Sequence, residues 1–221
     1  MAAVAHATTA AARAPREAIV EAIPGGYRCA RHLAGLFGEV ALFMAVPAAL
    51  LRDVRPWEWL LVPAALVFAN AVEWLVHRGP LHHPTRARLL YQRHTLTHHA
   101  VFSHDTMAMR SWREARVVLF PLFALPLLQL VVVPPFALLW ALGARNAACL
   151  FSLSATFYYL LYEVLHLAYH LPEGHPASRL RLVRALGRHH QRHHDPRRMT
   201  EGNFNVSIPL CDWLAGSLLK D

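Results

Sequence analysis

The sequence predicts an all-α integral membrane protein with four transmembrane helices and a histidine-rich helical cap on the cytosolic side. Its composition predicts the membrane: hydrophobic residues make up 55% of the 221 residues, the mean hydropathy is +0.26, and charged residues amount to only 16%. A soluble domain usually has about 25% charged residues. The distribution of histidine predicts the cap, because 14 of the 16 histidines lie in two windows, 77–104 and 166–194.

The chain begins with a tail, expected at residues 1–32, that is either disordered or a surface helix. The remainder, residues 33–221, is predicted to be one membrane-bound domain, because a chain of this length leaves little room for a second one. Crossing a bilayer takes about 20 apolar helical residues. Four stretches meet that length, and the predicted spans are residues 33–51, 57–76, 117–142 and 147–169.

The second span is the most apolar, with Asn70 as the only polar residue between positions 60 and 72. A helix of a soluble bundle would carry a polar stripe instead. The first span contains one acidic residue, Glu39. The third span contains the pair Pro134 and Pro135, which predicts a kink or an end within it.

Basic residues predict the orientation. With four spans, the tail, the segment 77–116 and the segment after His170 share one side, and they hold 19 of the 22 Lys and Arg residues. Such regions stay in the cytoplasm, so we expect both termini and the histidine windows there. The Ala- and Arg-rich composition favours a bacterial inner membrane. Topology accounts for the net charge of +8, and no nucleic-acid motif accompanies that charge, so we expect no nucleic-acid partner.

The histidines recur in four short spacings. Residues three or four apart share one face of a helix, so each group can direct imidazoles towards a metal ion. Between the first two histidines, Gly79 and Pro80 predict a helix end that turns the second one back. The ten candidate metal ligands are His77 and His82 (HxxxxH), His94, His98 and His99 (HxxxHH), His166 and His170 (HxxxH), and His190, His193 and His194 (HxxHH).

Ten imidazoles exceed the four ligands of a tetrahedral zinc site and fit two metal ions with four or five nitrogen ligands each. Imidazole binds iron, zinc, copper and nickel, so the ligand type leaves the metal open. His189 is a rival of His190, because HxxxHH is also formed when counting from His189; we favour His190. The remaining histidines of the windows are interpreted as surface or supporting residues: His83, His104 and His175.

The order of these groups, with two spans before the first and two between the second and third, resembles the fatty acid hydroxylase and sterol desaturase superfamily. The string Asn-Phe-Asn-Val at residues 203–206, followed by Asp-Trp-Leu-Ala-Gly at residues 212–216, also resembles the end of those proteins. The resemblance covers roughly residues 35–218. Many members have HxxHH as the second group, whereas this chain has three residues between His94 and His98.

The resemblance implies a membrane-bound di-iron oxygenase whose clustered histidines hold two iron ions. It would use O2 and an external electron donor to hydroxylate a C–H bond of a lipid-like substrate of fatty acyl, sterol or carotenoid type. This chain lacks the cytochrome b5-like domain of some members, so we expect a separate electron-transfer protein of ferredoxin or cytochrome type. A desaturase with the same site is an alternative. A metal transporter is a weaker one, because only Glu39 and Asn70 are polar and deep in the spans.

Two carboxylates precede candidate ligands on the same helix face: Glu73 lies four residues before His77, and Glu163 three before His166. We expect each either to accept the imidazole N–H that faces away from the metal or to pair with an arginine at the interface. Four aromatic residues before the third group either pack or line a channel for an acyl chain: Phe157, Tyr158, Tyr159 and Tyr162.

Overall fold

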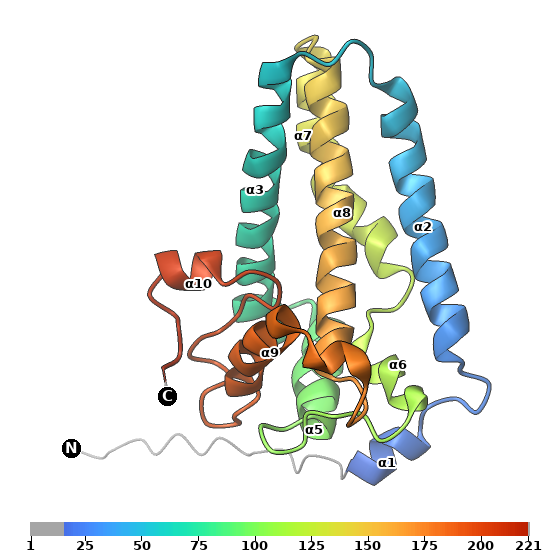
Figure 1. Ribbon diagram of the computed structural model, residues 1–221, viewed down its shortest axis with the longest axis vertical. Coiled ribbons are helices and arrows are strands. Elements are labelled where there is room, and N and C mark those ends of the chain that lie inside the picture. Colours follow the sequence, from blue (N-terminus) through green and yellow to red (C-terminus); the bar gives the residue numbers. More distant parts are fainter. Residues whose placement is uncertain (1–15, 221) are drawn as a thin grey trace.

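The computed structural model describes residues 16–220, and these contain helices but no strand. Four long helices run roughly side by side, and short helices and loops gather at one end of them as a cap (Figure 1). Four helices are long and apolar enough to cross a membrane, so the prediction of an all-α protein with four spans is confirmed. Residues 1–15 of the expected tail lie outside the described residues.

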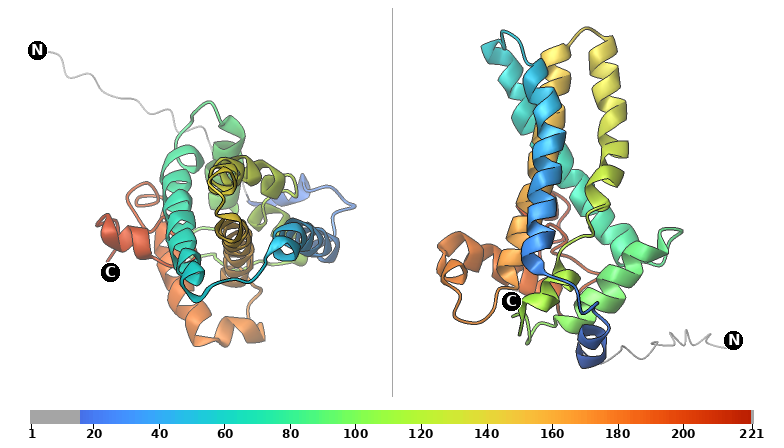
Figure 2. Two further views of the ribbon diagram at one scale, coloured as in Figure 1. Left: turned by 90° about the horizontal axis from the view of Figure 1, so that it is seen from above. Right: turned by 90° about the vertical axis from the view of Figure 1, so that its right-hand side faces the viewer.

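Three of the four candidate spans pack around the fourth, α8 (Arg145–Tyr169). The three are α2 (Cys29–Leu50), the continuous stretch of η1 (Pro56–Leu60), α3 (Leu61–Val76) and η2 (His77–Leu81), and α7 (Ala124–Ala141). Helix α8 packs against α2, α3 and α7 and lies between α2 and α3 when seen from above (Figure 2). In its most apolar stretch, 67% of the residues are buried, against 11–17% in the other spans. Those three helices therefore present most of their surface to lipid.

The third span begins later than the sequence predicts. Its apolar run starts at Val117, but α7 begins at Ala124 because the backbone is extended at Leu119 and Pro121 follows, which lacks an N–H for a helical bond. Val117 and Leu119 are buried instead in the core of the cap. The proline pair at 134–135 lies inside α7 and does not end it.

The cap consists of short elements before, between and after the spans. They are α1 (Arg16–Glu21), α4 (Arg88–Arg93), η3 (His94–His98), α5 (His99–Val101), η4 (Trp112–Glu114), α6 (Ala115–Val118), η5 (Pro176–Arg179), α9 (Arg181–His193) and α10 (Leu210–Leu214). Their core includes Val101, Phe102 and Met109, each at most 2% exposed. Helix α10 packs against α3, so the C-terminal segment is attached to the membrane end of the cap.

Candidate metal centre

Ten buried histidines meet where the cap joins the spans, and they are the ten that the sequence singles out. They form two groups of five, and the candidate ligand atoms within each group all lie within 4.8 Å of one another. None of the ten side chains is more than 5% exposed. The first group contains His77, His82, His94, His99 and His193, and the second contains His98, His166, His170, His190 and His194.

Two π-helical turns, η2 and η3, begin at candidate ligands and explain the longer spacings. A π-helical turn closes with an i→i+5 hydrogen bond, and such turns are frequent at functional sites. Residues five apart then lie on the same side: the ring centroids of His77 and His82 are 5.1 Å apart, and those of His94 and His99 are 4.7 Å apart. The π-helical turn η3 thus accommodates the one residue by which the HxxxHH spacing exceeds HxxHH.

The two groups cut across the spacings of the sequence. The expectation that His94 and His98 face one metal ion is wrong, since the π-helical turn places His98 in the second group. The same expectation for the HxxHH group is also wrong, because His193 faces the first group while His190 and His194 face the second. The groups are adjacent, with ring planes only 22° apart and centroids 4.2 Å apart between His99 and His194.

Most of the imidazoles are oriented by a hydrogen bond from Nδ1. Five donate to backbone carbonyls: His77 to Phe204, His98 to Val117, His170 to Met107, His193 to Gly202, and His194 to Phe102. A sixth, His82, lies 3.1 Å from the hydroxyl of Thr95, which itself donates to the carbonyl of Leu81 and therefore accepts from His82. Since a carbonyl only accepts, the hydrogen is on Nδ1 and Nε2 carries a free lone pair.

These lone pairs face one another. Nε2 of His82 lies 2.9 Å from Nε2 of His193 in the first group, and the corresponding distance between His98 and His194 in the second group is 3.2 Å. Two ring nitrogen atoms that carry no hydrogen cannot form a hydrogen bond with each other, whereas a cation between them is stabilised by both lone pairs. The donor set of each group therefore fits a metal ion.

The imidazoles are also held in the neutral form that binds metal. Burial lowers the pKa of His170 and the pKa of His193 to about 4. Burial likewise lowers the pKa of His98 and of His99 well below the usual value for histidine. These four candidate ligands are therefore unprotonated at neutral pH.

Neither carboxylate accepts a hydrogen bond from the histidine that follows it on its helix, so the first of the two roles considered for Glu73 and Glu163 is wrong. Glu73 accepts hydrogen bonds from the backbone N–H groups of Val206 and Ser207 and from the hydroxyl of Tyr158, while His77 donates to a carbonyl. Glu163 lies 3.3 Å from the N–H of Phe120. The donors to each carboxylate include backbone N–H groups from segments distant in the sequence, at Val206 and Ser207 for Glu73 and at Phe120 for Glu163. The spacing of residues along a helix does not predict such partners.

Three further features concern residues outside the two groups. The side chain of His189, the rival of His190, lies 3.3 Å from a carboxylate oxygen of Asp212 instead. Of the four aromatic residues before the third group, Phe157 is 48% exposed whereas the three tyrosines are buried, so the four do not line one channel. Sequence reasoning did not predict that Asp212 and Thr95 support the site. For Asp212 the sequence holds one signal, since this acidic residue stands directly before Trp213 and Leu214.

A model of the fatty acid hydroxylase family matches residues 62–217, well over half of the chain. No curated protein and no solved structure matches it. The matched stretch contains both groups of histidines, the helices α7 and α8, and α3 except for its first residue. The chain therefore belongs to the fatty acid hydroxylase family.

Proposed function

We propose that this protein is a membrane-bound di-iron oxygenase that hydroxylates an unactivated C–H bond of a lipid-like substrate. The observation that carries the proposal is the pair of five-histidine groups, each with facing Nε2 lone pairs in a buried site. Family membership supports an oxidoreductase. Ten neutral nitrogen donors and no cysteine in either group disfavour a thiolate-bound metal and are compatible with iron, and the choice of iron among the metals that imidazole binds rests on the family.

Each group would hold one iron ion through its five Nε2 atoms. Bound iron would supply the activation of O2 and the removal of hydrogen from the substrate. The protein orients the imidazoles through their Nδ1 hydrogen bonds. It also excludes water, since the ligands are buried. The centre lies at the end of α8, where the ring of Tyr162 is 5.5 Å from that of His166, so a lipid chain would approach from the membrane side.

The orientation and the partners follow from charge and from the family. The side that carries 19 of the 22 basic residues would face the cytoplasm, of a bacterial inner membrane in our proposal. Electrons would come from a separate ferredoxin- or cytochrome-type protein. Desaturation by the same site is the alternative reaction, and it differs only in the fate of the substrate.

The metal content of purified protein tests the proposal. Protein from iron-supplemented cells should contain about two iron ions per chain, and the double variant His193→Ala/His194→Ala, which removes one ligand from each group, should lose them. His83→Ala is the matched control, because His83 is exposed and outside both groups. One iron or none in folded wild-type protein would contradict the proposal.

The reaction is tested with lipid extract, O2 and a reducing system. A product heavier by one oxygen atom supports hydroxylation. A product lighter by two hydrogen atoms supports the desaturase instead. Absence of both products from protein with two iron ions would contradict an oxidative function.

A further inference from the structure

We propose that the two metal groups are positioned by two separate clamps, one formed by the C-terminal segment and the other by a segment in the middle of the chain that Arg16, near the N-terminus, holds in place. Residues 202–219, fixed by Asp212, position the first group. Residues 102–117, fixed by the buried pair of Arg16 and Glu114, position the second. This inference rests on the proposed function in so far as each group binds a metal ion.

Two imidazoles of the first group donate hydrogen bonds to backbone carbonyls of the C-terminal segment. Nδ1 of His193 donates to the carbonyl of Gly202 at 2.9 Å, and Nδ1 of His77 donates to the carbonyl of Phe204. The positions of these two carbonyls determine where the two imidazoles point. No histidine of the second group has a hydrogen bond from its ring to residues 202–219 among the bonds of the described chain.

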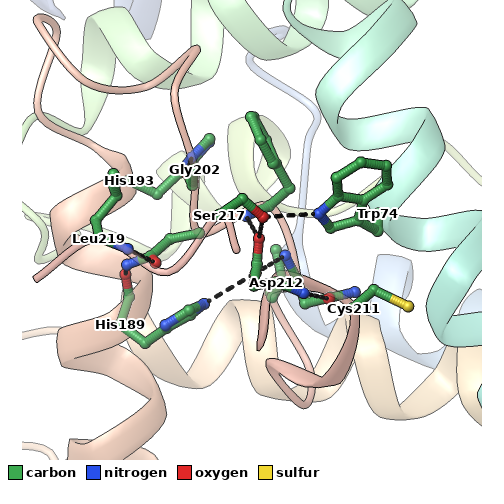
Figure 3. A network of polar contacts seen from close by, with 12 residues as sticks. Trp74, His189, His193, Gly202, Cys211, Asp212, Ser217 and Leu219 are labelled. Carbon is green, nitrogen blue, oxygen red and sulfur yellow. Dashed lines mark hydrogen bonds and ion pairs between the residues drawn. The ribbon is translucent and has the colours of Figure 1, made fainter. Parts of the chain in front are cut away.

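Asp212 holds that segment in place from within the protein (Figure 3). Its side chain is fully buried. One carboxylate oxygen accepts from the N–H of Phe204 at 3.0 Å and the other from the N–H of Asn205 at 2.8 Å. The hydroxyl of Ser217 donates to Oδ1 of Asp212 at 2.7 Å, and Nε2 of His189 lies 3.3 Å from Oδ2. The carboxylate thus fixes the backbone on both sides of the carbonyl that orients His77.

The second group is supported by a different segment. Nδ1 of His194 donates to Phe102 at 2.6 Å, Nδ1 of His170 to Met107 at 2.8 Å, and Nδ1 of His98 to Val117 at 3.3 Å; all three acceptors are backbone carbonyls between residues 102 and 117. The two sets of supporting carbonyls share no member. Each group can therefore be disturbed without touching the support of the other.

A buried ion pair closes the second segment. The guanidinium of Arg16, on α1, donates to the two carboxylate oxygens of Glu114 at 2.6 and 3.2 Å and to the carbonyl of Ala108 at 2.9 Å. It also lies 5.4 Å from the ring centroid of Phe102. Glu114 accepts in addition from the N–H of Arg110 at 2.7 Å. Both charged side chains are nearly inaccessible, so removing one leaves the other buried and unpaired.

Asp212, Arg16 and Glu114 belong to neither group of histidines. They are therefore positioning residues. Losing an outer hydrogen-bond partner typically lowers metal affinity about 10- to 100-fold. We expect Asp212→Asn to weaken the first group by this factor and leave the second unchanged. Glu114→Gln should do the reverse.

The test is titration of Fe(II)-loaded protein with a coloured iron chelator under anaerobic conditions, together with circular dichroism to verify folding. Each single variant should release one iron ion readily and retain one, and the double variant should release both. The surface changes Asp105→Asn and Glu17→Gln are matched controls, since these side chains are 92% and 71% exposed, and they should behave as wild type.

Ligand variants identify which group is affected. His99→Ala removes a ligand of the first group and His166→Ala one of the second, and Nδ1 of both residues has no partner among the described residues, so neither change disturbs a clamp. Asp212→Asn added to His99→Ala should still leave one tightly held iron ion. Added to His166→Ala, it should leave none. Glu114→Gln should give the opposite pattern.

Equal weakening of both groups by Asp212→Asn, or wild-type release from either clamp variant, would overturn the inference. Wild-type protein that does not bind two iron ions would overturn the proposed function instead. If a clamp variant does not fold, Ser217→Ala and Arg16→Lys replace it, because each leaves the buried carboxylate of the same clamp in place and removes only part of its contacts. These should weaken the same group less strongly, and weakening of the other group would again overturn the inference.

Discussion

Replacing Gly202 with alanine should damage both the fold and the first metal group. The backbone of Gly202 passes so close to Ser217 that a Cβ atom would lie 2.0 Å from the carbonyl oxygen, whereas Cβ atoms essentially never come within 3.0 Å of another heavy atom. The neighbour is backbone, which cannot rotate away as a side chain does. The two segments must therefore separate by about 1 Å, a typical response to overpacking.

The structure gives the size of the effect. A hydrogen bond of 2.9 Å joins the N–H of Asn203 to the carbonyl of Ser217, and another of 2.9 Å joins His193 to the carbonyl of Gly202. A displacement of about 1 Å stretches either one beyond hydrogen-bonding distance. Overpacking costs about 1–3 kcal/mol and a lost hydrogen bond about 1 kcal/mol. The free energy of unfolding should therefore fall by about 2–4 kcal/mol.

Thermal unfolding in detergent and iron content per chain measure this prediction. Gly187→Ala in α9 is the matched control, because its Cβ would meet a ring carbon of Tyr169 at an ordinary 3.5 Å. Alanine is favoured over glycine in a helix by up to about 1 kcal/mol, so this variant should be as stable as wild type or more so. A Gly202→Ala protein with the melting temperature and iron content of wild type would refute the reasoning.

Three other predictions concern pH, a buried amide and helix packing. Burial lowers the pKa of His170 and of His193 from 6.5 to about 4. The unfolded chain therefore binds protons at these histidines at a higher pH than the folded protein does, and the free energy of unfolding should fall as the pH drops from 6.5 towards 4. A melting temperature that stays constant over this range would contradict the prediction. Asn70→Leu removes three hydrogen bonds and should cost about 1–3 kcal/mol for each buried group left unpaired, measured by chemical unfolding. In α7, Leu125→Ala at a fully buried position should cost about 2–5 kcal/mol, whereas Leu130→Ala, 68% exposed, should be close to neutral in the same melting assay.

The sequence by itself determined the number of spans and the identity of the ten clustered histidines. Both are properties of short stretches. A span requires a run of apolar residues, and all four runs correspond to helices that could cross a membrane. Histidines three to five residues apart remain close in any helical turn, so the members of each spacing, such as His166 and His170, had to meet near the same place.

Only the tertiary structure decided how those histidines divide into two groups and what orients them. The division depends on the π-helical turn that separates His94 from His98, and its hydrogen bonds are not encoded by residue spacing. The supporting carbonyls come from far along the chain: 127 residues separate His77 from Phe204. Such contacts form only when the cap folds, because backbone carbonyls occur at every residue and only the fold decides which one reaches a ring nitrogen.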